Sequence, residues 1–103
     1  MNDVDLERAH RETVRWRILK TLDAGRPLPV SETVILRTLE DTHNRVTPHG
    51  LRRELDYLAT RELIALSGRD GPIWSAQLTR AGIDIVDYTV DCQPGIARPA
   101  KWY

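Results

Sequence analysis

Apolar residues repeat at intervals of three or four over the first quarter of the chain, which is the spacing of one helix face. The repeating residues are Val14, Ile18, Leu19 and Leu22. They predict a helix over about 5–24, which Gly25 ends. Trp16 falls outside this face, because each residue turns a helix by about 100°. It therefore needs a second surface to cover it.

The next segment changes from extended to helical. Two prolines in residues 26–30 exclude a continuous helix and predict a connector that lends one residue pair to a sheet. Ser31 is a good N-cap for a second helix, which should end near Asp41. Its apolar positions are Val34, Ile35, Leu36 and Leu39. A polar turn, "DTHNRV", follows.

A third helix is predicted over 47–60. Thr47 suits the N-cap, and Pro48 occupies the first helical position, where a missing N–H costs nothing. The inward stripe is Leu51, Leu55 and Leu58. This helix start is strongly specified by local sequence.

The second half of the chain predicts a β-hairpin and a last helix. Alternating apolar positions flank the turn residues 68–71, which indicates a hairpin over 64–78. Thr79 should cap a last helix that runs to Cys92, and 93–103 should be an extended tail. We therefore predict a mainly α (α+β) chain in the order α-α-α-β-β-α, with one domain at 1–92 and a tail at 93–103.

This order of elements is that of a winged helix-turn-helix. The pairs Leu63-Ile64 and Leu78-Thr79, the latter followed by Gly82, resemble winged-helix bacterial regulators of the ArsR and MarR kind. The whole chain resembles small winged-helix proteins of Mu-like bacteriophages and prophages. The matching stretches are "RWRILKTLDAG", "LRRELDYLATRELI" and "GIARPA". The resemblance implies a cytoplasmic DNA-binding protein, a phage or prophage transcription regulator, without enzyme activity.

Composition adds limits on size, location and charge. The 103 residues give room for one domain, and formal net charge is zero, whereas nucleic-acid binders usually carry a basic excess. The charges are unevenly distributed, however. Residues 43–69 hold five arginines and three acids, while 79–92 hold one arginine and three aspartates. No apolar run could span a bilayer, the N-terminus is acidic, and Cys92 is the one cysteine, so we expect a bacterial cytoplasmic location.

The outward side of the third helix is the predicted reader of a DNA major groove. Because the leucines face inward, Arg52 or Arg53 could donate twice to a guanine edge. Gly50 would let the helix N-terminus approach a phosphate, and Arg69 at the hairpin tip could enter the minor groove. The predicted DNA-binding residues are Arg45, Thr47, His49, Gly50, Arg52, Arg53 and Arg69.

A solvated helix face is the alternative interpretation. Arg52 could simply pair with Asp56 one turn later, which contributes about 0.2 to 0.5 kcal/mol. Arg69 would then be an exposed turn residue. Zero net charge and Asp56 favour a different function for the same fold, a protein-interaction adaptor in phage assembly or DNA packaging that does not bind specific DNA.

The last helix has more apolar positions than one core needs, which predicts an interface. We expect a two-fold homodimer through the first and last helices, with two reading helices about one DNA turn apart. Its predicted residues are Trp16, Ile83, Val86, Val90, Trp102 and Tyr103. The alternative is that the tail folds back within one chain and covers Trp16.

Neither metal nor catalytic chemistry is predicted. The three histidines belong to separate elements without ligand spacing, and the aspartates at 84, 87 and 91 form a solvated face. No serine or cysteine lies in a nucleophile motif, and there is no glycine-rich phosphate loop. We expect no cofactor, no metal and no membrane partner.

Overall fold

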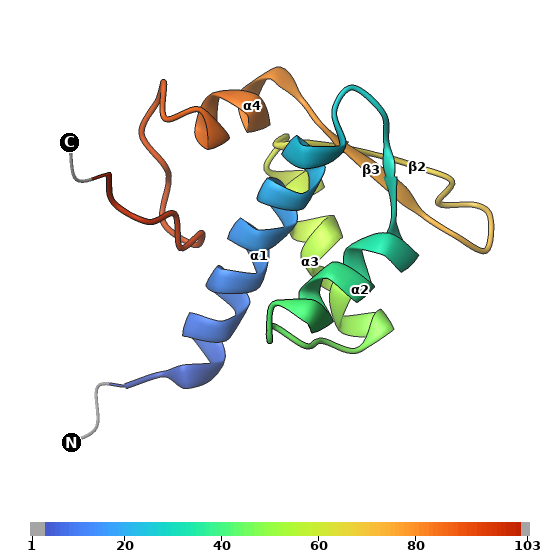
Figure 1. The fold of residues 1–103 in the computed structure, drawn as a ribbon, viewed down its shortest axis with the longest axis horizontal. Coiled ribbons are helices and arrows are strands. Elements are labelled where there is room, and N and C mark those ends of the chain that lie inside the picture. The colour runs from blue at the N-terminus through green and yellow to red at the C-terminus, as the bar shows by residue number, and fades with distance from the viewer. Residues whose placement is uncertain (1–3, 102–103) are drawn as a thin grey trace.

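The computed structural model describes residues 4–101 as a compact α+β fold with four helices and a three-stranded antiparallel sheet (Figure 1). The elements in chain order are α1 (Leu6–Gly25), β1 (Val30–Ser31), α2 (Glu32–Asp41), α3 (Pro48–Thr60), β2 (Ile64–Ser67), β3 (Ser75–Leu78) and α4 (Arg80–Val86). No helix within these residues is long and apolar enough to cross a membrane.

Side-chain caps fix where the helices begin. Ser31, Thr47 and Thr79 each accept a hydrogen bond from the backbone N–H three residues later, as predicted. Asp5 caps α1 in the same way. Each cap satisfies an N–H that has no partner within its helix, so these starts are specified locally.

The last helix is shorter than predicted, and the expected end at Cys92 is wrong. α4 stops at Val86, because Tyr88 has a positive φ of 61° that cannot continue a right-handed helix. This conformation places the Tyr88 ring edge-on to Trp16, with ring centroids 6.2 Å apart. A contact between distant segments thus accompanies the end of the helix.

The sheet has the strand order β1-β3-β2. In its register Val30 pairs with Ala76, and Ile64 pairs with Leu78. The segment after the prolines therefore joins the sheet as predicted, although it contributes two residue pairs rather than one. Because β1 continues directly into α2, this pairing ties the start of α2 to the hairpin.

The core lies between the four helices and the sheet, and Figure 1 shows α1 running through the middle of the molecule. Every residue of the predicted inward stripes of α1 and α3 is buried. Gly82 permits close packing of α4, since a Cβ there would lie 2.1 Å from the carbonyl oxygen of Leu63. A glycine is thus required three residues after Thr79, because the backbone of Leu63 lies so close to this position.

The chain after α4 returns along α1. The backbone N–H of Ala97 donates to the carbonyl of Glu12 at 3.1 Å, and the Ile96 side chain is buried. The Tyr88 hydroxyl donates to the carbonyl of Pro99 at 2.7 Å. The tail is irregular and extended, and it packs against its own chain.

Candidate nucleic-acid interface

The outer side of α3 carries the residues that sequence analysis placed there. Leu51, Leu55 and Leu58 are buried, which turns His49 and Arg53 to the surface. Arg52 and Asp56 are partly exposed beside them. Each of these polar side chains carries or can acquire a charge. Whether it is available to a ligand depends on whether a neighbouring residue already pairs with it.

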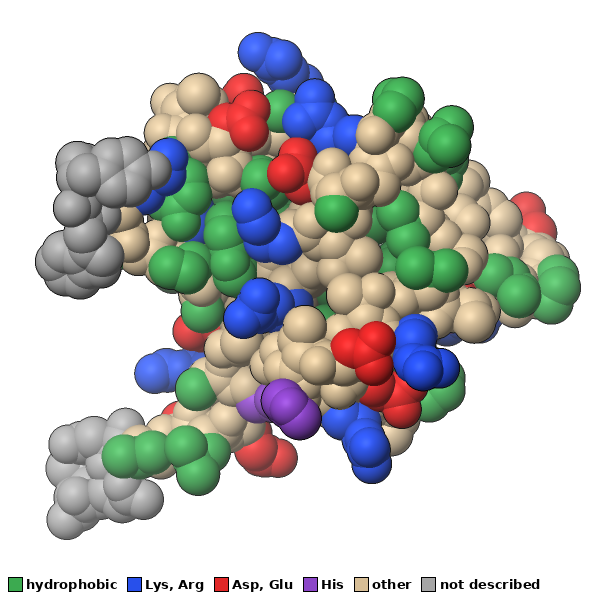
Figure 2. Space-filling model, in the orientation of Figure 1, with side chains coloured by type: hydrophobic (Ala, Val, Ile, Leu, Met, Phe, Trp, Pro, Cys, Tyr) green, Lys and Arg blue, Asp and Glu red, His purple; other side chains and the backbone are tan. Residues whose placement is uncertain are grey.

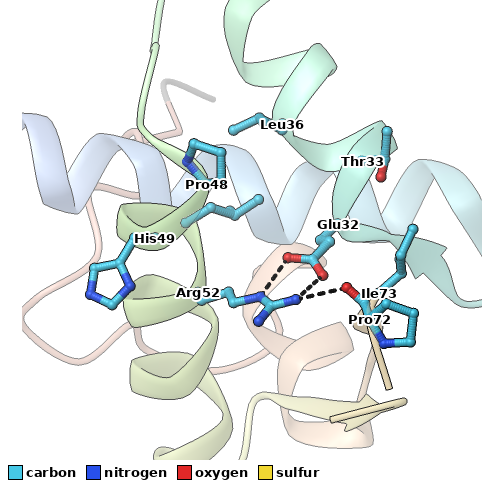
Figure 3. Close-up of a pocket in the computed structure, with 9 residues that line it drawn as sticks. Glu32, Thr33, Leu36, Pro48, His49, Arg52, Pro72 and Ile73 are labelled. Atoms are coloured by element: carbon cyan, nitrogen blue, oxygen red, sulfur yellow. Dashed lines mark hydrogen bonds and ion pairs between the residues drawn. The ribbon is translucent and has the colours of Figure 1, made fainter. Parts of the chain in front are cut away.

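Arg52 is held in a two-pronged ion pair with Glu32, the first residue of α2. Its Nε donates to Glu32 Oε1 at 2.8 Å, and its Nη2 donates to Oε2 at 2.7 Å (Figure 3). Nη2 also donates to the carbonyl of Pro72 in the hairpin loop at 3.1 Å. The predicted alternative partner, Asp56, is not the one observed. Arg52 therefore joins α2, α3 and the hairpin.

Both carboxylate oxygens of Glu32 accept hydrogen bonds in this arrangement. Its Oε2 accepts a further hydrogen bond from the backbone N–H of Trp74 at 2.6 Å, and its side chain is 12% exposed. The hydrogen bond from Arg52 lowers the pKa of Glu32 below its usual value, in spite of burial, and the same bond raises the pKa of Arg52. Both groups are thus fixed in their charged forms. Such a pair positions the hairpin instead of presenting a free cation.

Arg69 at the hairpin tip is also paired, and its partner is Asp56 on α3. Nη2 of Arg69 lies 2.7 Å from Asp56 Oδ1, and the two side chains are 49% and 46% exposed. An ion pair this accessible to water contributes only about 0 to 1 kcal/mol. This contact links the hairpin to α3 weakly, and nothing in the sequence spacing indicated it.

Both paired arginines lie over the ring of Trp74. The guanidinium carbon of Arg52 is 4.5 Å from the ring centroid, and that of Arg69 is 4.8 Å away. Guanidinium groups stack favourably on indole, which is the best aromatic partner for a cation. Trp74 thus contacts both guanidinium groups.

The unpaired cations of the predicted interface lie at the beginning of α3 and in the turn before it. Within residues 4–101, no hydrogen bond or ion pair holds the guanidinium group of Arg45 or Arg53, and both residues are exposed. They line an open hollow of about 290 Å³ that Arg11 and His10 of α1 also line.

Two acids, Glu7 and Glu54, line the same hollow. Glu54 is neutralised by Arg15, whose Nε lies 2.7 Å from its Oε1. Three arginines and one histidine therefore face a single uncompensated carboxylate. The hollow is the most basic part of the predicted interface.

Thr47 and Gly50 serve the helix cap itself. The Gly50 N–H donates to Thr47 Oγ1 at 2.9 Å, and Gly50 is buried. This N–H is already satisfied, so it does not offer the open phosphate contact that the glycine suggested.

An apolar groove of about 440 Å³ lies between α2, the start of α3 and the hairpin loop, and sequence analysis missed it. Figure 3 shows the Glu32–Arg52 pair beside it. Its apolar lining includes Leu36, Pro48, Pro72 and Ile73. The signal available in the sequence was the run Val34-Ile35-Leu36, because three consecutive residues cannot all face one core.

The predicted dimer residues have different surroundings. Trp16 is 7% exposed and Val86 is also buried, both within one chain. Ile83 is half-buried, and Val90 is 46% exposed. Trp102 and Tyr103 lie outside the described residues. Trp16 therefore has its covering surface in its own chain, and the dimer stays a prediction.

Metal-binding geometry is absent from the described part of the chain, where no three His, Cys, Asp or Glu side chains come together. Burial raises the pKa of the Cys92 thiol, although nearby Arg98 and Arg61 oppose this rise. Its Sγ lies 4.0 Å from the carbonyl oxygen of Ile96. Cys92 is therefore a contact of the tail.

Comparisons with known proteins returned no match. No family model matches this chain, no curated protein is significantly similar to it, and no solved structure matches its fold.

Proposed function

We propose that this chain binds double-stranded DNA as a winged helix-turn-helix protein. In this proposal α2 and α3 form the helix-turn-helix, α3 enters the major groove, and the β2–β3 hairpin is the wing. The order of elements and the exposed outer side of α3 support this assignment. The sequence resemblance suggests a phage or prophage transcription regulator as the class, without enzyme activity.

The exposed, unpaired guanidinium group of Arg53 is the observation that carries the proposal. It lies in the second turn of α3, where a groove-reading helix contacts bases or phosphates. Arg45 and His49 are exposed close to it in sequence and add to the contact set, to which Arg69 of the hairpin tip also belongs. Arg52 is better assigned to positioning the wing, since its best donors already bind Glu32.

So few cations imply modest affinity that is sensitive to salt. Each phosphate contact releases counterions, so the logarithm of the binding constant falls against the logarithm of salt concentration with a slope of about −0.9 per contact. Arg45, Arg53 and Arg69 together would give a slope of about −2 to −3.

The first prediction is that Arg53→Ala weakens binding to duplex DNA by about ten-fold and reduces the salt slope by about one. Fluorescence anisotropy with labelled duplexes from pooled genomic fragments, titrated at several salt concentrations, measures both quantities. Arg80→Ala is the matched control, because Arg80 is an exposed arginine on α4. Equal losses in the two variants, or no binding of wild-type protein to any duplex, would contradict the proposal.

The apolar groove favours a second candidate, an adaptor that binds an apolar segment of another protein. The start of α3 forms one wall of the groove, and Ile73 at its edge is half-exposed. The pairing of Arg52 and Arg69 also reduces the charge available for DNA. A chain that binds no duplex at low salt would leave this groove as the better candidate site.

A further inference from the structure

We propose that Asp56 is a specificity-determining residue that holds Arg69 in the unbound protein and releases it to a DNA phosphate. This inference rests on the proposed DNA-binding function and assigns a role to the acid on the reading helix. In the unbound chain, the Asp56 carboxylate pairs with the Arg69 guanidinium group, which a phosphodiester would otherwise bind. We call this exchangeable contact the Asp56–Arg69 latch.

The latch can exchange partners because water reaches both groups. About half of each side chain is exposed, and the contact between them runs from Nη2 of Arg69 to Oδ1 of Asp56. Arg69 follows Gly68, whose φ of 76° places it in a turn at the end of the hairpin. A phosphate close to this tip could take the guanidinium group without displacing any buried atom.

The Glu32–Arg52 pair behaves differently and keeps the hairpin in place. It has two hydrogen bonds between the charged groups, a third from the Trp74 backbone to Glu32, and a fourth from Arg52 to the Pro72 carbonyl. The β1–β3 register adds a second attachment. Release of Arg69 from Asp56 therefore leaves the hairpin where it is, and the guanidinium group gives up an exposed ion pair and a contact with the Trp74 ring.

The consequence is discrimination between well-placed and poorly placed DNA. A duplex that puts a phosphate at the hairpin tip recovers the Arg69 contact and separates it from Asp56. On a duplex that does not do so, Arg69 stays paired with Asp56, and the pair offers no net positive charge to phosphate. Asp56 thus removes the attraction that an unpaired Arg69 would give to any DNA, and Arg69 contributes only where a phosphate displaces the carboxylate.

The test is a double-mutant cycle on Asp56 and Arg69, read by anisotropy with duplex DNA. Asp56→Asn should raise affinity about three- to five-fold, the range expected for breaking an exposed pair. Arg69→Gln should lower affinity, and Asp56→Asn should then give little further gain. Asp84→Asn is the charge-matched control, since Asp84 pairs with Arg80 on α4, and it should give a much smaller gain.

Two results overturn the latch while leaving DNA binding intact. One is an Asp56→Asn gain that persists in full in the Arg69→Gln background, which would mean general repulsion. The other is the absence of any Asp56→Asn gain although the wild-type chain binds duplex in an Arg53-dependent manner. Failure of every variant to bind any duplex would instead refute the proposed function, and the latch with it.

Side-chain NMR gives a reading that a purely structural role would not produce. On addition of duplex, the Nε–Hε signal of Arg69 should move, whereas that of Arg52 should stay close to its unbound position. In Asp56→Asn without DNA, the Arg69 signal should already be displaced while the unfolding midpoint is nearly unchanged. An Arg69 signal that is unaffected by duplex would overturn the proposal.

Discussion

Arg52 and Arg53 are consecutive on α3, yet their guanidinium groups have opposite surroundings. Arg52 faces the α2 side and is bound by Glu32, while Arg53 is exposed and has no ion-pair partner among residues 4–101. Three further arginines serve the fold, because each donates to backbone carbonyls of α4 or of the chain after it; they are Arg15, Arg61 and Arg98. These arginines, like Arg52, thus hold segments of the fold together.

The Glu32–Arg52 pair predicts a pH dependence of stability. Because the pKa of Glu32 in the folded chain lies below its ordinary value of 4.5, the pair stabilises the fold fully above about pH 4.5. This stabilisation is lost as the pH falls from there through the lowered pKa. Glu32→Gln should therefore be less stable than wild type near neutral pH. Its free energy of unfolding should fall less steeply as the pH is lowered, and the difference in slope should correspond to at most about one bound proton. Urea unfolding at a series of pH values measures this.

Glu40→Gln is the control for that measurement, because Glu40 is an exposed glutamate on the same helix. It should retain the wild-type dependence on pH. If Glu32→Gln and wild type lost stability in parallel on acidification, the charged pair would not be the source of the stabilisation.

Some ends of the helices could be predicted from the sequence and others could not. The difference is how far apart in sequence the residues lie that determine each end. The caps at Ser31, Thr47 and Thr79 act over three residues, so the starts of α2, α3 and α4 were correct. The end of α4 was missed: it follows from the positive φ of Tyr88 and accompanies a contact of Tyr88 with Trp16 of α1, more than 70 residues earlier in sequence, which no local pattern indicates.

The same contrast applies to the candidate site. Helical spacing correctly turned Arg53 outward, but it offered only Asp56 as a partner for Arg52. The real partner, Glu32, is 20 residues away on another helix, and Arg69 takes Asp56 from the hairpin. Periodicity assigns a side chain to a face, whereas pairing across elements depends on how the elements pack.

The tail behaves as a packed element, and Cys92 can report on it. Burial raises the pKa of this thiol, so little reactive thiolate should be present near pH 8 and labelling by a disulfide reagent should be slow. Ile96→Ala removes the buried side chain that anchors the tail and should speed labelling several-fold. Val90→Ala, at an exposed neighbouring position, should leave the rate nearly unchanged. Equal rates in wild type and Ile96→Ala would contradict packing of the tail at this point.

The distribution of charged and apolar side chains over the molecular surface affects whether the chain is expected to be a monomer or a dimer. Figure 2 shows basic and acidic side chains interspersed on one face, with apolar side chains reaching the end of the hairpin. In the proposed function, a single copy would offer DNA only a small basic area around Arg53. A dimer would double this area, but Trp16 and Val86 of its predicted interface are already buried within one chain.

We therefore expect the chain to have its monomer mass of 11.8 kDa in solution at micromolar concentration, measurable by light scattering after gel filtration. The tail and Tyr88 already cover α1 around Trp16, and among the described residues of the predicted interface only Val90 is exposed, which is too small a patch for a stable interface. If α3 enters the major groove as proposed, a monomer should protect a single half-site of DNA. A mass of twice this value would instead confirm the predicted dimer. Val90→Asp should then return the mass to that of one chain, because a charge at the centre of an apolar contact cannot be buried without a partner.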